Sequence, residues 1–311
     1  MNTSVLRRLW TAPQIPAGIA HGDMPGDVIC IGEEHIRKAE TLFPPLKAMA
    51  ADQIEKNPNG RAVVSVCGGS GVGKSEIASI LAYYFGEMGV GAYTLSGDNY
   101  PRRIPMDNDA ERLRVFRTGG LRGLVASGVY DLRMADALRA LWAREADADM
   151  GVFAEYPWME IYRKAGYGAL MGYLGTKAEI DFDEVSAIIA QFKRGAQSLM
   201  LKRMGRERGA LWYEPVDLSG VQVLVIEWTH GNSDLLEGVD IPVLLNSTPQ
   251  ETLAHRMARN RDGRIDSAFT TMVLEIEQRK LDSQAWRAGL ILSKAGELMD
   301  YAAYRRAMAD A

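Results

Sequence analysis

The chain has 311 residues, of which 47% are hydrophobic and 24% are charged, and its formal net charge is −4. This composition is typical of a globular protein that is long enough for one large α/β domain or two smaller ones. The mild acidity, without any block of Lys and Arg, argues against nucleic-acid binding. No apolar run approaches the ~18 residues of a membrane helix, so no membrane partner is expected.

The N-terminal residues and the cysteines bear on location. Residues 1–20 contain charge but no continuous apolar core of the kind found in secretory signals. Cys30 and Cys67 are too few for a disulfide scaffold, and together these features predict a cytoplasmic protein. A redox switch is conceivable for Cys67, but a small buried residue at a strand end is favoured.

The predicted elements begin with an N-terminal extension, residues 1–58, packed on the core. Pro- and Gly-rich pieces come first, and a helical run covers residues 32–57. From residue 61 onward, short strands that are apolar on both faces alternate with helical segments, which is typical of a parallel sheet covered by helices. The five expected strands are 61–67, 91–98, 221–228, 241–248 and 289–293.

A different composition, rich in Ala, Met, Tyr, Trp and charge, appears between about 119 and 212. It predicts helices without a clear strand. The aromatic clusters of residues 153–173 fit helix packing, and a substrate lid is the alternative. The chain is therefore predicted to hold one domain, residues 59–311, with a helical insertion at about 119–180.

Residues 68–75, GGSGVGKS, match the phosphate-loop pattern G-x-x-x-x-G-K-[ST] between a predicted strand and a predicted helix. Glycines let successive backbone N–H groups point at phosphate oxygens, and the helix N-terminus favours an anion. Lys74 supplies a charge for the β- and γ-phosphates, and the Ser75 hydroxyl can ligate Mg²⁺. ATP and Mg²⁺ are therefore the expected cofactors. The predicted nucleotide-binding residues are Gly69, Ser70, Gly71, Val72, Gly73, Lys74, Ser75 and Glu76.

Two carboxylates are expected near the γ-phosphate. Asp98 follows the second predicted strand, and Glu227 follows the apolar run 223–226. Ligands of open α/β sheets bind at the carboxyl ends of the strands. Asp98 could accept a proton from an attacking hydroxyl or hold Mg²⁺ through water, although a simple turn would also explain it. Glu227 would contact the Mg²⁺ shell, and His230 could contact substrate or be structural.

An arginine cluster, Arg256, Arg259, Arg261 and Arg264, lies between the fourth predicted strand and a predicted helix at 267–280. Arginines on a closing segment can stabilise charge on a transferring phosphoryl group, which favours a lid. A solvated basic helix face is the alternative.

The order of these motifs resembles the uridine kinase/phosphoribulokinase family of P-loop small-molecule kinases over roughly 60–118 and 180–294. The resemblance rests on "GGSGVGKS", "LSGDNYPR", "IDFDEVSAIIAQFKRGA", "YEPVDLSGVQVLVIEWTHG" and "VDIPVLLNSTPQETLAHRMARNRDGR". It implies a P-loop NTPase fold, a three-layer α/β/α arrangement with a mainly parallel five-stranded sheet. It also implies roles for five residues: Asp98 as catalytic base, Asp183 on acceptor hydroxyls, Glu227 on Mg²⁺, and Arg259 and Arg264 as lid arginines.

The chain departs from this family at several positions. It has Tyr213 but not the His-x-Arg that precedes the Glu strand in uridine kinases, which disfavours uridine. Trp228 replaces the usual Gly after Glu227, and the shorter lid leaves the alignment of Arg256 and Arg261 open. The insertion is positioned to cover the acceptor side. "SGDNYPRR" also resembles adenylylsulfate kinases.

The sequence thus predicts a kinase, with Lys74, Asp98, Arg259 and Arg264 as catalytic residues. It would transfer the γ-phosphoryl group of ATP to a hydroxyl of a small metabolite, a polyol, sugar or hydroxy acid such as glycerate. The predicted acceptor-binding residues are Asp98, Tyr100, Arg102, Arg103, Asp183 and His230.

Two alternatives stay open. One is an adenylylsulfate or nucleoside kinase. The other is a P-loop NTPase that acts as a switch or chaperone without an acceptor, although no N-K-x-D motif of GTPases is found. The sequence leaves open the acceptor, the regulation and the oligomeric state, and a homodimer is compatible with it.

Overall fold

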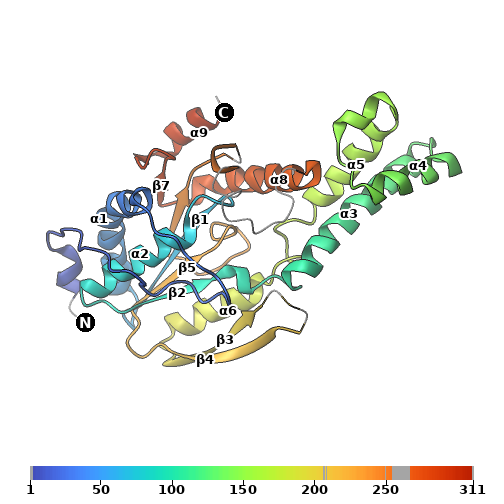
Figure 1. Cartoon of the computed structure of the whole chain (residues 1–311). Helices are drawn as coiled ribbons and strands as arrows, with labels where there is room; N and C mark the ends of the chain where they lie inside the picture. Colours follow the sequence, from blue (N-terminus) through green and yellow to red (C-terminus); the bar gives the residue numbers. More distant parts are fainter. Residues whose placement is uncertain (1–2, 206, 208, 249, 254–266, 310–311) are drawn as a thin grey trace.

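The computed structural model describes residues 3–205, 207, 209–248, 250–253 and 267–309. Its centre is a six-stranded sheet in the order β2-β5-β1-β6-β7-β8 (Figure 1). The first five of these strands are parallel, and β8 pairs antiparallel with β7. All five strands predicted from apolar runs are present, which confirms the α/β class with a mainly parallel sheet. The bounds are β1 (Ala62–Gly68), β2 (Ala92–Ser96), β5 (Val223–Glu227), β6 (Ile241–Leu245), β7 (Leu290–Leu292) and β8 (Leu298–Met299).

Helices cover both faces of the sheet. Alternate residues of β1 point to opposite faces, so Val64 and Val66 pack with α1 and α2, whereas Val63 packs with α6. Cys67 is buried against α8 and α9, as expected for a small residue at a strand end. Within the described residues, no helix is long and apolar enough to cross a membrane. The bounds are α1 (Glu33–Lys56), α2 (Lys74–Glu87), α6 (Phe182–Lys193), α8 (Ala268–Gln284) and α9 (Tyr301–Ala309).

The N-terminal residues share a hydrophobic core with the sheet. Phe43 of α1 contacts the ring of Tyr84 in α2 at a centroid distance of 5.2 Å, and Trp10 packs against both rings. Residues 19–31, here called the N-terminal strap, have no regular secondary structure and reach the edge of the sheet at which the parallel strands end.

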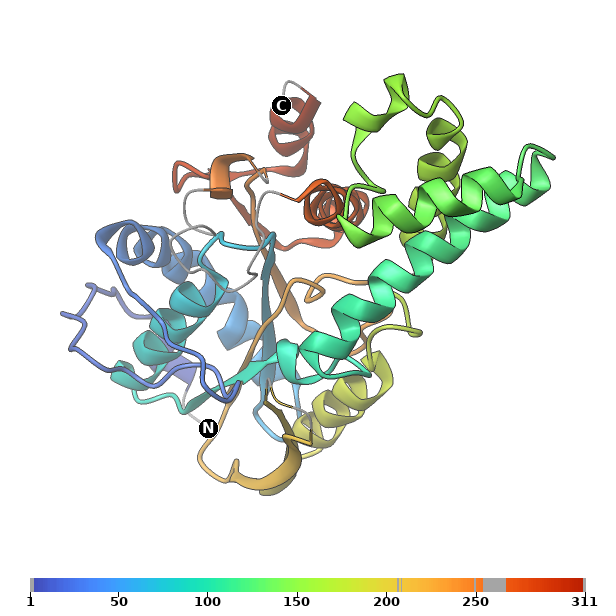
Figure 2. The ribbon, with the colours of Figure 1, turned by 45° about the vertical axis from the view of Figure 1, so that its right-hand side comes forward.

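A helical arm projects away from the sheet, as Figures 1 and 2 show. It consists of α3 (Pro105–Ala126), α4 (Leu132–Ala143) and α5 (Met159–Met171). α3 and α5 approach closely because glycines face the other helix: a Cβ at Gly119 would lie 2.4 Å from Ala169 Cβ. The arm has a hydrophobic cluster of its own, which also includes Met272 and Ile276 of α8.

The prediction that residues 119–212 lack a strand is wrong. β3 (Ser198–Met204) and β4 (Leu211–Asp217) form an antiparallel hairpin beside α6. Neither strand is a continuous apolar run, because β4 is largely exposed and β3 carries two buried cations, Lys202 and Arg203, that pair with carboxylates elsewhere in the fold. Such a strand lacks the apolar signal on which the prediction depended.

Candidate active site

The phosphate loop connects β1 to α2. Gly68, Gly71 and Gly73 have φ values of 154°, 78° and 94°, which residues with a Cβ rarely adopt. A Cβ at Gly68 would also lie 2.6 Å from the Leu245 carbonyl oxygen. The Lys74 Nζ donates to the Gly69 carbonyl at 3.1 Å, so the lysine folds back over the loop. The loop therefore requires glycine at these positions.

Glu227 lies beside the phosphate loop because of the strand order. β5 is inserted between β1 and β2, and the registers place Glu227 opposite Val66 on one side and Ser96 on the other. The Ser75 Oγ donates to the Glu227 Oε2 at 3.1 Å, and the Ser96 hydroxyl donates to Oε1. Burial and the nearby charge of Asp98 raise the pKa of Glu227 to about 8.

Asp98 is exposed between two fixed neighbours. Gly97 lies directly against the indole of Trp228, since a Cβ at Gly97 would be only 2.0 Å from the Trp228 Cγ. Asn99 is buried, and its Oδ1 accepts a hydrogen bond from the Met204 N–H at 2.9 Å. These contacts explain the sequence "SGDN" and aim the Asp98 side chain away from the core.

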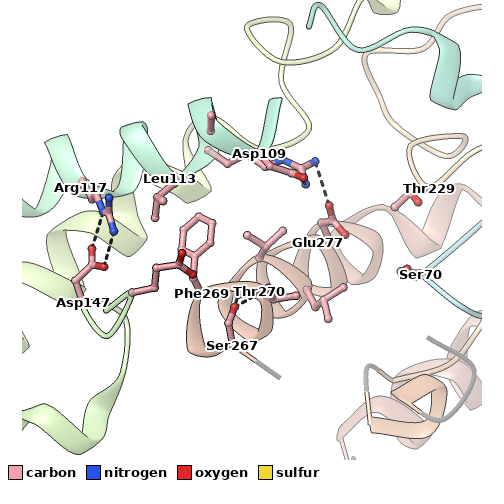
Figure 3. Close-up of a pocket in the computed structure, with 15 residues that line it drawn as sticks. Ser70, Asp109, Leu113, Arg117, Asp147, Thr229, Ser267, Phe269, Thr270 and Glu277 are labelled. Carbon is pink, nitrogen blue, oxygen red and sulfur yellow. Dashed lines mark hydrogen bonds and ion pairs between the residues drawn. The ribbon is translucent and has the colours of Figure 1, made fainter. Parts of the chain in front are cut away.

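Asp98 lines a cavity of about 570 Å³, here called the inner cavity. A second cavity of about 470 Å³, here called the outer cavity, lies between α3 and α8 (Figure 3). The two adjoin, because five of the described residues line both: Ser70, Asp109, Arg112, Thr229 and Glu277. Together they form one cleft that leads from the phosphate loop to the helical arm.

Arg112 of α3 connects the walls of this cleft. Its Nε lies 2.6 Å from Glu179 Oε1 in the segment before α6, and its Nη2 lies 3.5 Å from Glu277 Oε1 in α8. Burial opposes ionisation of Glu179, but the charge of Arg112 and the hydrogen bond from the Gly175 N–H, together with smaller contributions, outweigh it and hold the pKa of Glu179 below its usual value. Burial raises the pKa of Glu277. No motif in the sequence indicates Arg112 or Glu277, which lie within the long helices α3 and α8.

The two arginines that were predicted to bind the acceptor make their contacts outside the cleft. Arg102 donates to the Lys177 carbonyl oxygen at 2.6 Å and to Asp181 at 3.0 Å. Arg103 donates to the Tyr173 hydroxyl at 3.0 Å. Both arginines therefore anchor the segment between α5 and α6, and neither lines the inner or outer cavity.

The other predicted acceptor residues divide between core, surface and cleft. Tyr100 is buried in the core beside Phe182, away from the cavity walls. Asp183 is exposed and forms an ion pair with Lys177 at 2.6 Å, also outside the cleft. His230 does line the inner cavity, where burial lowers its pKa to about 4 and keeps the ring neutral near pH 7. The predicted lid arginines Arg256, Arg259, Arg261 and Arg264 lie outside the described residues.

The N-terminal strap contributes to the site, which the sequence did not indicate. The side chain of Asp23 is only 9% exposed; its Oδ1 accepts the Ser96 N–H at 2.8 Å, and its Oδ2 accepts the Arg203 Nη1 at 2.9 Å. The Asn99 side chain also donates to Asp23, at 3.0 Å. Met24 and Asp27 follow on the strap and line the inner cavity. An aspartate in a Pro- and Gly-rich stretch carries no signal for such a role.

No protein-family model matches the chain. A curated protein, the bifunctional alpha-galactosidase/sucrose kinase of Mediterraneibacter gnavus, is 41% identical over 244 residues, which is 78% of this chain. The chain spans only about a fifth (21%) of the length of that relative.

Solved structures with a similar course of the chain include three kinases. Phosphoribulokinase from Rhodobacter spheroides has a TM-score of 0.45 at 16% identity, with 75% of this chain and 70% of that one covered. D-glycerate 3-kinase from Cryptococcus neoformans has a TM-score of 0.45 at 11% identity, with 87% and 99% covered. A possible uridine kinase from Bacillus stearothermophilus has a TM-score of 0.40 at 15% identity, with 79% and 98% covered.

Proposed function

We propose that the chain is an ATP-dependent kinase that transfers the γ-phosphoryl group to a hydroxyl of a neutral sugar. The observation that carries this proposal is that Ser70 of the phosphate loop and the exposed Asp98 line one cleft. Glu227, which accepts a hydrogen bond from Ser75, lies near enough for the charges of Asp98 and Lys74 to act on its pKa. The relative named as a sucrose kinase supports it. Of the two activities in that name, the kinase is the one that a phosphate loop serves.

The donor side would hold ATP with Mg²⁺. The loop N–H groups and Lys74 would bind the β- and γ-phosphates. Ser75 and Glu227 supply oxygen donors, which suit Mg²⁺, an ion that is usually bound by one or two protein oxygens together with phosphates and water. When bound, Mg²⁺ would neutralise phosphate charge.

On the acceptor side, Asp98 would act as the base. As the acceptor oxygen bonds to the γ-phosphorus, the bond to the β-phosphate oxygen breaks, ADP leaves, and the hydroxyl proton passes to the Asp98 carboxylate. Trp228 and the neutral His230 form a wall of the cavity next to Asp98. Their rings would help to keep water, a competing acceptor, out of the reaction.

The charges of the cleft favour a neutral acceptor. The two arginines among the described lining residues, Arg112 and Arg117, are both paired with carboxylates. An anionic acceptor such as glycerate or adenylylsulfate would therefore meet carboxylates and find no unpaired guanidinium among these described residues, whereas sugar hydroxyls can donate hydrogen bonds to carboxylates. Arg102 and Arg103 are engaged outside the cleft. The carboxylates that line the two cavities are Asp27, Asp98, Asp109, Glu145, Asp147 and Glu277.

The test is an acceptor screen with the purified chain, ATP and Mg²⁺, in which ADP formation and the mass of the phosphorylated product are both measured. We expect turnover with sucrose or another neutral sugar, and little with glycerate, uridine or adenylylsulfate. Preferential turnover of glycerate or adenylylsulfate would overturn the charge argument. ATP hydrolysis that is equally fast with and without every acceptor would instead favour the switch or chaperone alternative.

A further inference from the structure

We propose that the outer cavity selects the acceptor by holding the second ring of a disaccharide while the first ring presents its hydroxyl to Asp98 in the inner cavity. This inference rests on the proposed function, because it assumes a sugar acceptor. It adds a binding subsite on the helical arm, built from residues that no motif of the sequence indicates.

The first support is the shape of the cleft. The inner and outer cavities, of about 570 and 470 Å³, adjoin along Arg112, Thr229 and Glu277. Each has the volume of a small-molecule site, for which roughly 300–1,000 Å³ is usual. In Figure 3, Ser70 and Thr229 lie at one end of the outer cavity, and Arg117 and Asp147 lie at the other. A single ring beside Asp98 would leave this second space unused.

The second support is the chemistry of the outer cavity. Arg117 donates two hydrogen bonds to Asp147, at 2.9 and 3.0 Å, and the Tyr162 hydroxyl donates to the same carboxylate at 3.1 Å. Leu113 and Phe269 add apolar surface on opposite walls, from α3 and α8. Fixed polar groups beside an aromatic surface match a sugar ring, which has polar edges and apolar C–H faces.

The third support is the backbone of Glu145, another lining residue. Its φ is 54°, and no other described residue apart from glycines has a positive φ. Glu145 follows α4 directly after the C-cap, where a left-handed residue is usually Gly. The chain does use Gly in this conformation after three other helices, at Gly89, Gly128 and Gly195. Glu145 thus holds a strained backbone conformation that glycine would adopt without strain. Residues in such conformations cluster at functional sites.

The test uses this strain. Glu145→Gly should fold at least as well as the wild type, because glycine adopts the left-handed conformation freely. If the carboxylate binds the second ring, the variant should raise the KM for sucrose about tenfold, whereas the KM for ATP stays the same. The preference for sucrose over glucose or fructose should fall with it. Glu145→Gln, which keeps the side-chain size, should shift the sucrose KM in the same direction.

The matched control is Glu155→Gln, which removes an exposed carboxylate of the same arm that lines neither cavity. It should leave the KM for sucrose, the KM for ATP and the preference for sucrose over glucose or fructose unchanged. A Glu145→Gly enzyme with the wild-type sucrose KM and sugar preference, or with a defect that Glu155→Gln reproduces, would overturn the proposal.

Direct binding separates this inference from the proposed function. Calorimetric titration of the intact chain with sucrose should give a dissociation constant that Glu145→Gly weakens about tenfold. A chain that binds sucrose in this way but phosphorylates neither sucrose nor any other sugar would refute the kinase assignment and leave the subsite standing. Phosphorylation of sucrose with unchanged sucrose binding in Glu145→Gly would overturn the subsite and leave the proposed function standing. No binding of sucrose at all would also overturn the subsite, while turnover of another neutral sugar in the acceptor screen would keep the proposed function.

Discussion

The two sides of the cleft are built in different ways. The donor side is contiguous: residues 68–75 form the loop, and the geometry follows from a strand, three glycines in unusual backbone conformations and a helix N-terminus. The acceptor side combines Asp27 of the strap, Asp98 after β2, Arg112 of the arm, His230 after β5 and Glu277 of α8. A binding site whose residues lie in one short segment can be recognised in a sequence. A site whose residues are brought together by packing cannot.

The two sides of the cleft also differ in the contacts that stabilise them. The loop depends on the backbone conformations of glycines that lie within one short segment. The Asp98 segment depends on residues far away in the chain: Trp228 against Gly97, and Asp23 and Met204 on either side of Asn99. The acceptor side should therefore be sensitive to changes that leave the donor side intact.

The largest effect is expected from Asp98→Asn, which removes the base and keeps its shape. The kcat should fall by about 10²–10⁴, the usual contribution of a positioned base, with nearly unchanged affinity for ATP. Steady-state kinetics and titration with ATP would measure the two separately. An active Asp98→Asn enzyme would contradict the base assignment, and a matching loss of ATP affinity would erase the distinction between donor and acceptor sides.

Asp23→Ala tests the dependence of the acceptor side on the strap. The substitution leaves the buried Arg203 without one carboxylate partner and the Ser96 N–H without an acceptor. Breaking such a buried pair should lower the free energy of unfolding by about 3–5 kcal/mol, as measured by urea denaturation. The control is Asp52→Ala, whose ion pair with Arg7 is exposed and screened by solvent, so its loss should change the free energy of unfolding little. Equal effects of the two substitutions would show that the strap is not an anchor.

Gly97→Ala tests the contact beneath Asp98. The added methyl would lie 2.0 Å from the Trp228 Cγ, so the indole must move, at a cost of about 1–3 kcal/mol in stability. Gly86→Ala is the control, because a Cβ there meets nothing within 4 Å and should stabilise α2 by about 0.5–1 kcal/mol. Thermal denaturation compares the two, and a neutral Gly97→Ala would mean that Trp228 has room to move.

The smallest effect concerns pH and His230. Its pKa is lowered to about 4 by burial; the charge of Glu179 favours the protonated ring, and those of Arg112 and Lys280 oppose it. Between pH 4 and 6.5 the unfolded state thus binds more protons at this residue, so stability rises with pH across this window. Acidification from pH 7 to 5 should remove about 1–2 kcal/mol of stability through His230. Denaturation curves of His230→Gln should show a flatter pH dependence, and an unchanged slope would contradict the burial of the ring.

Much of the fold and the donor side could be predicted from the sequence. The five parallel strands appear as apolar runs because both of their faces are covered, and the carboxyl ends of parallel strands meet at one edge. That rule was enough to expect Glu227 beside the loop and Asp98 at the same edge, where the structure has them.

Only the tertiary structure decided the rest. In the structure, Tyr100 is buried, and Arg102 and Arg103 make their hydrogen bonds outside the cleft. Strand β3 pairs with β4, and Arg112 links α3 to α8. These outcomes depend on contacts between residues that are far apart in the chain, or on which side of an element faces the core. Local periodicity and motif spacing contain neither, so the sequence determined the phosphate loop and the packing of the chain determined the acceptor side.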